Sequence, residues 1–178
     1  MTGRVRLFTT VNNDNTELIM AKIHHYKAVI TWKGNRGQGT ADYKAYEREH
    51  DISVVGKPTI SASSDSAFRG DKSKHTPEDL LVCSLSGCHM LWYLHLCAVN
   101  GVVVSRYTDQ AIGIMEENQD GSGQFTEVVL NPEVVVAEES MIEKAKALHS
   151  ESNKMCFIAR SVNFPVRHQA KITCNEKA

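Results

Sequence analysis

The sequence has almost no net charge, since 20 basic residues balance 21 acidic ones and leave a formal charge of −1 over 178 residues. Proteins that bind nucleic acid or an anionic membrane surface usually carry an excess of basic residues. We therefore expect neither nucleic acid nor a membrane as partner. Low-complexity runs are also missing, and 42% hydrophobic residues suit one globular domain of this length.

The sequence also lacks an even set of cysteines and an apolar signal segment at its start. Secreted domains that depend on disulfides usually carry an even number of cysteines, whereas this chain has five. We therefore expect free thiols in a reducing, cytoplasmic setting. The five residues are Cys83, Cys88, Cys97, Cys156 and Cys174.

Charged residues are absent from Leu80 to Ser105, a stretch long enough to be weighed as a membrane span. Serine, glycine and histidine interrupt it, however, and soluble-looking sequence flanks it, so we favour a buried central helix over 76–99. Thr76 and Pro77 suit the N-cap and the first helical position. The spacing predicts one apolar stripe with Cys88 at its centre, formed by Leu81, Leu85, Cys88, Trp92 and Val99.

Residues 1–20 read as an extension and residues 21–178 as a single domain. A second amphipathic stretch predicts a helix at 138–154. The glycine-rich segment 34–40 lacks the patterns of phosphate-binding loops, so a hairpin turn is the simpler interpretation. With no βαβ repeat, the order of elements indicates an α+β fold of antiparallel strands. The expected strands cover residues 22–32, 41–49, 57–63, 102–115, 124–130, 133–136 and 164–173.

Cys88 and Cys156 are the cysteines that we single out, because each lies in an apolar segment within or next to a predicted helix. They are 68 residues apart in the sequence, so only folding could bring them close enough for a disulfide. Free cysteine is among the most buried residue types, and buried cysteines are mostly inert. Two structural thiols therefore remain an open alternative.

Glu78 lies ten residues before Cys88, close to three helical turns and nearly on the same face. A straight helix would separate the two by about 15 Å, so the simple role of Glu78 is to cap the first turn. A reactive thiolate would also need a cation beside it. Arg36, Arg48 and Arg69, in the polar segments ahead of the helix, are the candidates.

A zinc site built from Cys83, Cys88, His89 and His95 is a weaker alternative, because no CxxC or HxxxH pattern occurs. A serine hydrolase is weaker still, since the chain has no GxSxG motif. We therefore expect no bound metal.

Three stretches, TPEDLLVCSLSGCHM, VVVSRYTDQAIGIM and ALHSESNKMCFIA, together resemble the OsmC/Ohr family of thiol-dependent hydroperoxide reductases. The resemblance extends over about residues 26–172. It implies an OsmC-like fold, in which antiparallel sheets wrap around the two central helices of an intertwined homodimer. It also implies active sites at the subunit interface, where groups of a neighbouring subunit could reach Cys88.

By this resemblance Cys88 is the peroxidatic cysteine, Cys156 the resolving cysteine and Glu78 the glutamate of the motif. The arginine of the family falls nearest to Arg69, nine residues before Glu78. Phe157 follows Cys156 where many members have proline. The implied substrate pocket has apolar walls, for which we expect Phe68, Met90, Trp92 and Phe157.

The implied reaction reduces an organic hydroperoxide to an alcohol through a sulfenic acid on Cys88 and a disulfide with Cys156. An external dithiol, small or of the lipoyl type, then restores the thiols. Apolar walls would favour organic or fatty-acid hydroperoxides over hydrogen peroxide, and no cofactor is implied. The alternative is a non-catalytic, stress-related protein that binds an apolar ligand at the dimer interface.

Overall fold

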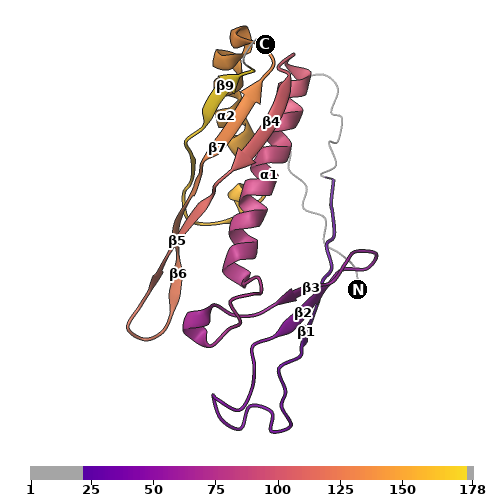
Figure 1. Ribbon diagram of the computed structural model, residues 1–178, viewed down its shortest axis with the longest axis vertical. Coiled ribbons are helices and arrows are strands. Elements are labelled where there is room, and N and C mark those ends of the chain that lie inside the picture. Colours follow the sequence, from indigo (N-terminus) through magenta and orange to yellow (C-terminus); the bar gives the residue numbers. More distant parts are fainter. Residues whose placement is uncertain (1–21, 176–178) are drawn as a thin grey trace, which may run out of the picture.

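The computed structural model describes residues 22–175, in which two helices accompany three three-stranded sheets (Figure 1). Helix α1 is Pro77–Val99 and helix α2 is Ile142–Met155, with short 3-10 helices η1 (Ser66–Phe68), η2 (Glu139–Met141) and η3 (Ala159–Ser161). The strands are β1 (Val29–Trp32), β2 (His50–Ser53), β3 (Ile60–Ala62), β4 (Val104–Asp109), β5 (Ile112–Glu117), β6 (Gly123–Leu130), β7 (Pro132–Val136), β8 (Val166–His168) and β9 (Lys171–Cys174). The predicted extension over 1–20 lies outside the described residues.

Helix α1 begins and ends where the sequence predicts. The Thr76 side chain accepts a hydrogen bond from the Asp79 amide, and the Asp79 carboxylate accepts one from the Thr76 amide, which forms a capping box. At the other end Asn100 is the C-cap, and Gly101 adopts a positive φ of 73° that suits glycine. The Lys144 ammonium donates to the carbonyl oxygen of Asn100 and so ties α2 to this end of α1.

The segment 102–115, expected as one strand, forms two strands that belong to different sheets. β4 pairs antiparallel with β7, whereas β5 pairs antiparallel with β6. The break falls at Gln110–Ala111, a pair that carries no turn signal of the glycine or proline kind. Asp109 fixes the break, since its carboxylate accepts hydrogen bonds from the Asn131 amide and from the Ser86 hydroxyl of α1.

The segment 164–173 also forms two strands where one was expected. β8 pairs parallel with β6, and β9 pairs parallel with β7. The prediction of purely antiparallel sheets was therefore wrong for the two last strands. Such short strands carry no periodicity that distinguishes parallel from antiparallel pairing.

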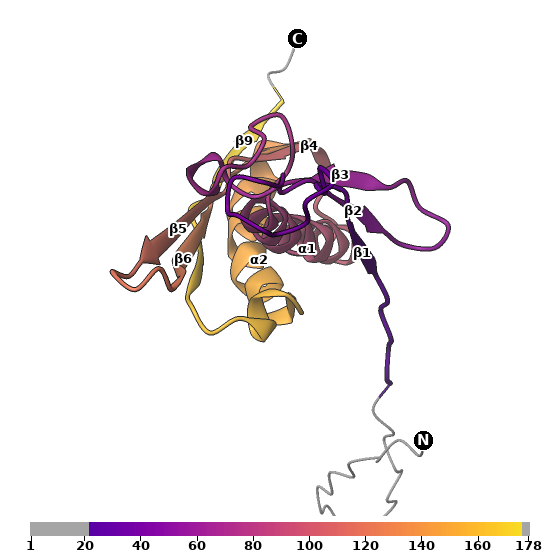
Figure 2. The ribbon, with the colours of Figure 1, turned by 90° about the horizontal axis from the view of Figure 1, so that it is seen from below.

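β1, β2 and β3 form an antiparallel sheet of their own. The predicted strand over 41–49 is absent, because this segment forms turns, and the chain returns as β2 instead. This sheet and the β5–β6 hairpin extend to opposite sides of α1 (Figures 1 and 2). Every residue of β1 is exposed, including Val29, Ile30 and Trp32. The sheet therefore presents apolar side chains that the described chain does not cover.

The buried stripe of α1 differs from the predicted one by a single helical position. Its fully buried residues are Leu85, His89, Tyr93 and Cys97, at four-residue steps, whereas Cys88 is half-buried. The C-terminal half of this stripe packs with α2 and β7, and the N-terminal half packs with β6. Cys88 therefore lies at the edge of the core.

Candidate active site

Cys156 lies immediately after α2 and is completely buried. As the C-cap, it donates its backbone amide to the carbonyl oxygen of Ser152 at 2.9 Å, and its sulfur accepts the amide of Ala159 at 3.4 Å. Burial, followed by a side-chain hydrogen bond to Cys88, raises the pKa of Cys156 to about 11. The structure thus brings together two cysteines that are far apart in the sequence.

Cys88 approaches Cys156 from α1, and both cysteines are free thiols. The pKa of Cys156 lies well above neutral, so Cys156 is protonated at physiological pH. Neighbouring thiols of this kind can serve as core residues or as a redox pair.

Two of the four predicted pocket residues lie beside this pair in the sequence and touch each other. The ring of Trp92, one turn after Cys88, packs edge-on against Phe157 with the centroids 5.7 Å apart. Phe157 is 67% exposed, so much of this aromatic pair faces solvent in the single chain. Met90 is half-buried, and Phe68 lies in another part of the molecule.

Phe68 and Glu78 line a cavity of about 550 Å³ between η1, the first turns of α1 and the β5–β6 hairpin. The Oε2 atom of Glu78 is buried and has no hydrogen-bond partner within residues 22–175. The thiol that lines this cavity is Cys83, not Cys88. Since α1 is a continuous helix from Pro77, the axial distance of about 15 Å separates Glu78 from Cys88 within one chain.

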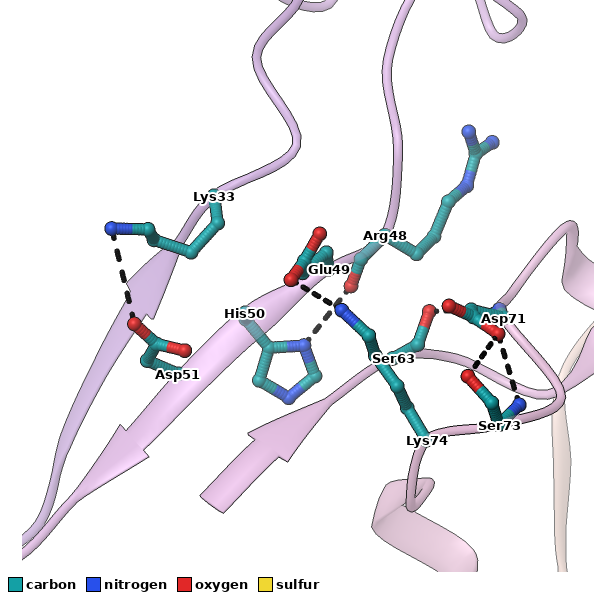
Figure 3. Close-up of polar contacts among 9 residues, drawn as sticks. All are labelled: Lys33, Arg48, Glu49, His50, Asp51, Ser63, Asp71, Ser73 and Lys74. Carbon is teal, nitrogen blue, oxygen red and sulfur yellow. Dashed lines mark hydrogen bonds and ion pairs between the residues drawn. The ribbon is translucent and has the colours of Figure 1, made fainter. Parts of the chain in front are cut away.

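Arg69 lies in the loop between β3 and α1, at the end of η1, with a left-handed φ of 66°. A residue other than glycine rarely adopts this conformation, so the loop must hold it in place. The amide of Asp71 donates to the Ser63 hydroxyl at 3.1 Å, and Lys74 pairs with Glu49 of the segment before β2 (Figure 3). These contacts fix both ends of the loop that carries Arg69.

The Arg69 guanidinium lies 5.9 Å from the ring centre of Tyr43. In the described part of the chain, no ion pair within 4.0 Å joins it to Glu78. The structure therefore does not bring Arg69, Glu78 and Cys88 together within one chain.

Three histidines that the sequence analysis did not group form a cluster, in which His89, next to Cys88 in the chain, and His149 are fully buried and His168 is half-buried. Nε2 of His89 and Nδ1 of His149 are 3.0 Å apart, and the two ring planes differ by 6°. His168 lies 5.7 and 5.8 Å from them, measured between ring centres. The four-residue step from Leu85 to His89 and on to Tyr93 was the sequence signal that could have revealed His89 as a core residue.

Burial lowers the pKa of His89 to about 4 and that of His149 to about 3, with further lowering from neighbouring histidines. Both are therefore neutral at physiological pH. Despite this clustering, no group of three or more histidine, cysteine, aspartate or glutamate side chains in residues 22–175 is arranged to hold a metal ion. The zinc alternative gains no support from the geometry.

The family model for OsmC-like proteins matches residues 70–171, more than half of the chain. The chain belongs to the OsmC-like protein family. The match contains α1, both cysteines of the pair and α2. No curated protein sequence matches the chain.

Solved structures agree with this OsmC-like fold. An OsmC-like protein of unknown function from Vibrio cholerae is 31% identical, with a TM-score of 0.76 over 84% of this chain and 100% of that one. An organic hydroperoxide resistance protein from Elizabethkingia anophelis is 14% identical, with a TM-score of 0.64 over 88% of this chain and 100% of that one. The identity of the second is low enough that it shows the fold alone.

One property of α1 fits both a core helix and a membrane span. By length and composition α1 could cross a membrane, although core helices of soluble proteins pass the same test. Of its most apolar 18-residue window, 22% is buried within the chain. In this OsmC-like protein one face of α1 packs against α2 and the sheets, and residues 22–175 leave the other face, with Leu91 and Val99, exposed.

Proposed function

We propose that this OsmC-like protein is a thiol-dependent peroxidase that reduces organic hydroperoxides at Cys88, with Cys156 as the resolving thiol. The observation that carries the proposal is the position of Cys88, on α1, beside the buried Cys156 that directly follows α2. Relatives of the same fold include organic hydroperoxide resistance proteins, which supports the same assignment.

In the first step, the thiolate of Cys88 attacks the distal oxygen of the hydroperoxide. An S–O bond forms, the O–O bond breaks, and the alkoxide takes up a proton and leaves as the alcohol. Sulfur loses two electrons and becomes a sulfenic acid, while the peroxide is reduced. The raised pKa of Cys156 keeps that residue protonated, so it does not compete with Cys88 for the peroxide.

In the second step, the sulfur of Cys156 attacks the sulfenic acid, forms the disulfide and releases water. Because Cys88 already lies beside Cys156, the two sulfur atoms have only a short way to move in this step. An external dithiol then reduces the disulfide by thiol–disulfide exchange and is itself oxidised. We propose a small or lipoyl-type dithiol for this role, in a cytoplasmic setting.

A second copy of the chain would supply what the single chain lacks at Cys88. Glu78 has a buried oxygen without a partner, and it cannot reach Cys88 along a continuous helix. We propose an intertwined homodimer in which Glu78 and Arg69 of one copy face Cys88 of the other. There Arg69 would stabilise the thiolate and polarise the peroxide, and Glu78 would orient the guanidinium.

The test is consumption of cumene hydroperoxide by the purified protein in the presence of dithiothreitol. Cys88→Ser should abolish consumption, because no other cysteine contacts Cys156 in this way. Without the dithiol, Cys156→Ser should consume about one equivalent of peroxide and then form sulfinic acid at Cys88 in excess peroxide, because the resolving thiol is gone. Cys174→Ser, at a half-buried cysteine outside the pair, is the matched control and should keep the activity.

Intact mass after one equivalent of peroxide provides the second readout. The wild type should lose its two thiol hydrogens, and peptide mapping should find the disulfide between Cys88 and Cys156. If wild type and Cys88→Ser consume peroxide equally slowly, the peroxidase assignment is wrong. The non-catalytic protein that binds an apolar ligand would then be the better description.

A further inference from the structure

His149 of α2 lies between two side chains of α1 that are one helical turn apart. Its Nδ1 atom is 3.0 Å from Nε2 of His89, in a hydrogen bond between the two rings. Its ring stacks on Tyr93 with the ring centres 3.8 Å apart and the ring planes 12° from parallel. All three side chains are fully buried. α1 therefore holds His149 from two sides.

The bond between His89 and His149 is the only hydrogen bond between side chains that joins α1 to α2 within residues 22–175. Before His149, α2 packs on α1 through Leu148 and other apolar residues. After it, the buried residue of α2 is Ser152, whose hydroxyl donates to the Leu148 carbonyl oxygen within the same helix. In the second half of α2, the position along α1 therefore depends on the histidine pair.

This pair lies close to the two cysteines in the chain. His89 directly follows Cys88 on α1, and His149 precedes Cys156 by seven residues, which is about two turns of α2. Two turns return to nearly the same face of a helix, so the face that carries His149 also leads to the side where Cys88 lies beside Cys156. A movement of α2 along α1 would therefore break the histidine bond and separate the two sulfur atoms together.

Strand β8 supports the same part of α2 from the side. The side-chain amide of Asn153, one turn after His149, donates to the Val166 carbonyl oxygen of β8 at 3.3 Å. The ring of His168, at the end of β8, lies 5.8 Å from that of His149, measured between ring centres. His168 packs against the pair and takes no part in the hydrogen bond that joins the two helices.

We propose that His89 and His149 are positioning residues for the resolving step, because their hydrogen bond fixes α2 along α1 and keeps Cys156 beside Cys88. The inference rests on the proposed function, in which a disulfide between these cysteines follows the sulfenic acid. Loss of one bonded nitrogen leaves the other buried without a partner. A movement of α2 that lets water reach this nitrogen then becomes favourable, and the two thiols meet less often.

The test measures the Cys88–Cys156 disulfide at equilibrium with glutathione, in a Cys83→Ser, Cys174→Ser background and without peroxide. The two protein thiols lose two electrons and two protons, and glutathione disulfide takes them up to give two molecules of glutathione. The equilibrium gives the effective concentration of one thiol at the other. His149→Gln should lower it by about tenfold, which raises the reduction potential of the pair by about 30 mV.

The matched variants exchange the two amide side chains. Asparagine carries its amide atoms as far from the backbone as Nδ1 of histidine, and glutamine carries them as far as Nε2. His149→Asn therefore keeps a polar atom at the bonded position and should stay within about threefold of the wild type. At position 89 the order is reversed, so His89→Gln should stay near the wild type and His89→Asn should lose about tenfold. His168→Asn removes a neighbouring ring without touching the bond and should also stay near the wild type.

Equal effective concentrations in His149→Gln and His149→Asn would overturn the inference, because packing and not the hydrogen bond would then align the cysteines. An equal loss in His168→Asn would overturn it as well. The equilibrium needs no peroxide, so a wild type that shows this pattern and consumes no hydroperoxide counts against the proposed function alone.

A measurement on the wild type decides the inference even where a variant does not fold. If the histidine bond favours the disulfide, the disulfide must favour the bond by the same factor. The N–H shared by His89 and His149, followed by nitrogen-15 NMR, should exchange with solvent about tenfold more slowly in the disulfide form than in the dithiol form, relative to the backbone amides of β7. The same relative exchange rate in both forms would overturn the inference.

Discussion

The three candidate arginines in the polar segments ahead of α1 have different surroundings. Arg36 pairs with Glu47 at 2.6 Å. The guanidinium of Arg48 lies over the rings of Tyr43 and Tyr46, at 4.3 and 4.2 Å, and donates to the carbonyl oxygens of both. Arg69 has no ion pair or side-chain hydrogen bond in the described part of the chain, which leaves its donors available to a thiolate.

We expect Arg69→Ala to lower kcat/KM with cumene hydroperoxide by about 100-fold, the effect of removing one donor to a developing negative charge. Arg36→Ala should keep kcat/KM near the wild-type value, because Arg36 pairs with Glu47 at the protein surface. Arg69→Lys should recover part of the loss, since a lysine keeps the charge without the fork of donors. A large loss in Arg36→Ala or Arg48→Ala, with Arg69→Ala active and folded, would move the cationic role to that residue.

The pair His89–His149 is held by a single hydrogen bond between neutral rings. A neutral imidazole has one N–H and one bare nitrogen, so the bond leaves an N–H at one outer end of the pair and a bare nitrogen at the other. Neither Nδ1 of His89 nor Nε2 of His149 has a partner among the described residues. The ring of Tyr93 stacks on His149 with the ring centres 3.8 Å apart. This burial disfavours the charged form of His149, because water cannot solvate it.

The histidine pair predicts loss of stability in acid. In the unfolded chain a histidine has a pKa of about 6.5, whereas His89 and His149 in the fold have pKa values of about 4 and about 3. Between these values the unfolded state binds more protons, so the free energy of unfolding falls as the pH drops from 6.5 toward 4.

Urea unfolding at several pH values checks this expectation. His149→Gln should flatten the pH dependence between about 6.5 and 4, because one of the two suppressed titrations is removed. His25→Gln, at an exposed position outside the cluster, should keep the wild-type slope. An unchanged slope in His149→Gln would show that carboxylates, not this pair, govern acid stability.

At the scale of the element, α1 was the part that the sequence predicted best. Its start is encoded by Thr76, Pro77 and Asp79, and its end by Asn100 and Gly101, so local chemistry decides both boundaries. Which face of α1 would be buried was harder to predict from the sequence, because the helix is apolar nearly all round. The stripe through Leu85 and Tyr93 was chosen by contacts with α2 and the sheets, which no spacing rule contains.

Apart from the segment 41–49, strands formed where they were predicted, but two of the predicted strands are each divided in two. The breaks at Gln110–Ala111 and Gln169–Ala170 carry no glycine or proline, so the sequence read as continuous strands there. Tertiary pairing divides each of these segments, because its two halves pair with strands of different sheets. The Asn131 amide donates to the Asp109 carboxylate at the first break, and the Gln169 amide donates to the Leu130 carbonyl oxygen at the second. The proximity of Cys88 and Cys156 also could not be predicted from local sequence, since it depends on how α1 packs against the end of α2.

At the scale of the whole molecule, the described chain leaves apolar surface uncovered on both α1 and β1. On α1, Leu91 is 66% exposed and Val99 is 64% exposed, and Leu91, Trp92 and His95 surround a shallow hollow of about 300 Å³. A contiguous apolar face of this kind marks an interaction surface. It is the natural place for the second copy that the proposed function requires.

We expect the protein to sediment as two copies of the 19.8 kDa chain. Leu91→Glu should weaken this dimer at micromolar concentration and lower peroxidase activity with it, because a buried charge without a partner opposes association. Lys146→Glu, on the exposed side of α2, is the control and should remain dimeric. Wild type that sediments as a single chain and still turns over peroxide would remove the need for a second copy.

The last two strands have a consequence for how the protein is made. β8 and β9 each add a parallel edge strand to one of the two sheets that follow α1, so one sheet is complete only after His168 has been translated and the other only after Cys174. A nascent chain on the ribosome holds β6 and β7 with one edge open, and parallel long-range pairing is slow to form. Cys88 and Cys156 likewise come together only after α2 has been made, since Cys156 follows that helix. Each of the two sheets that flank α1 and α2 therefore depends on a strand that follows both helices in the chain.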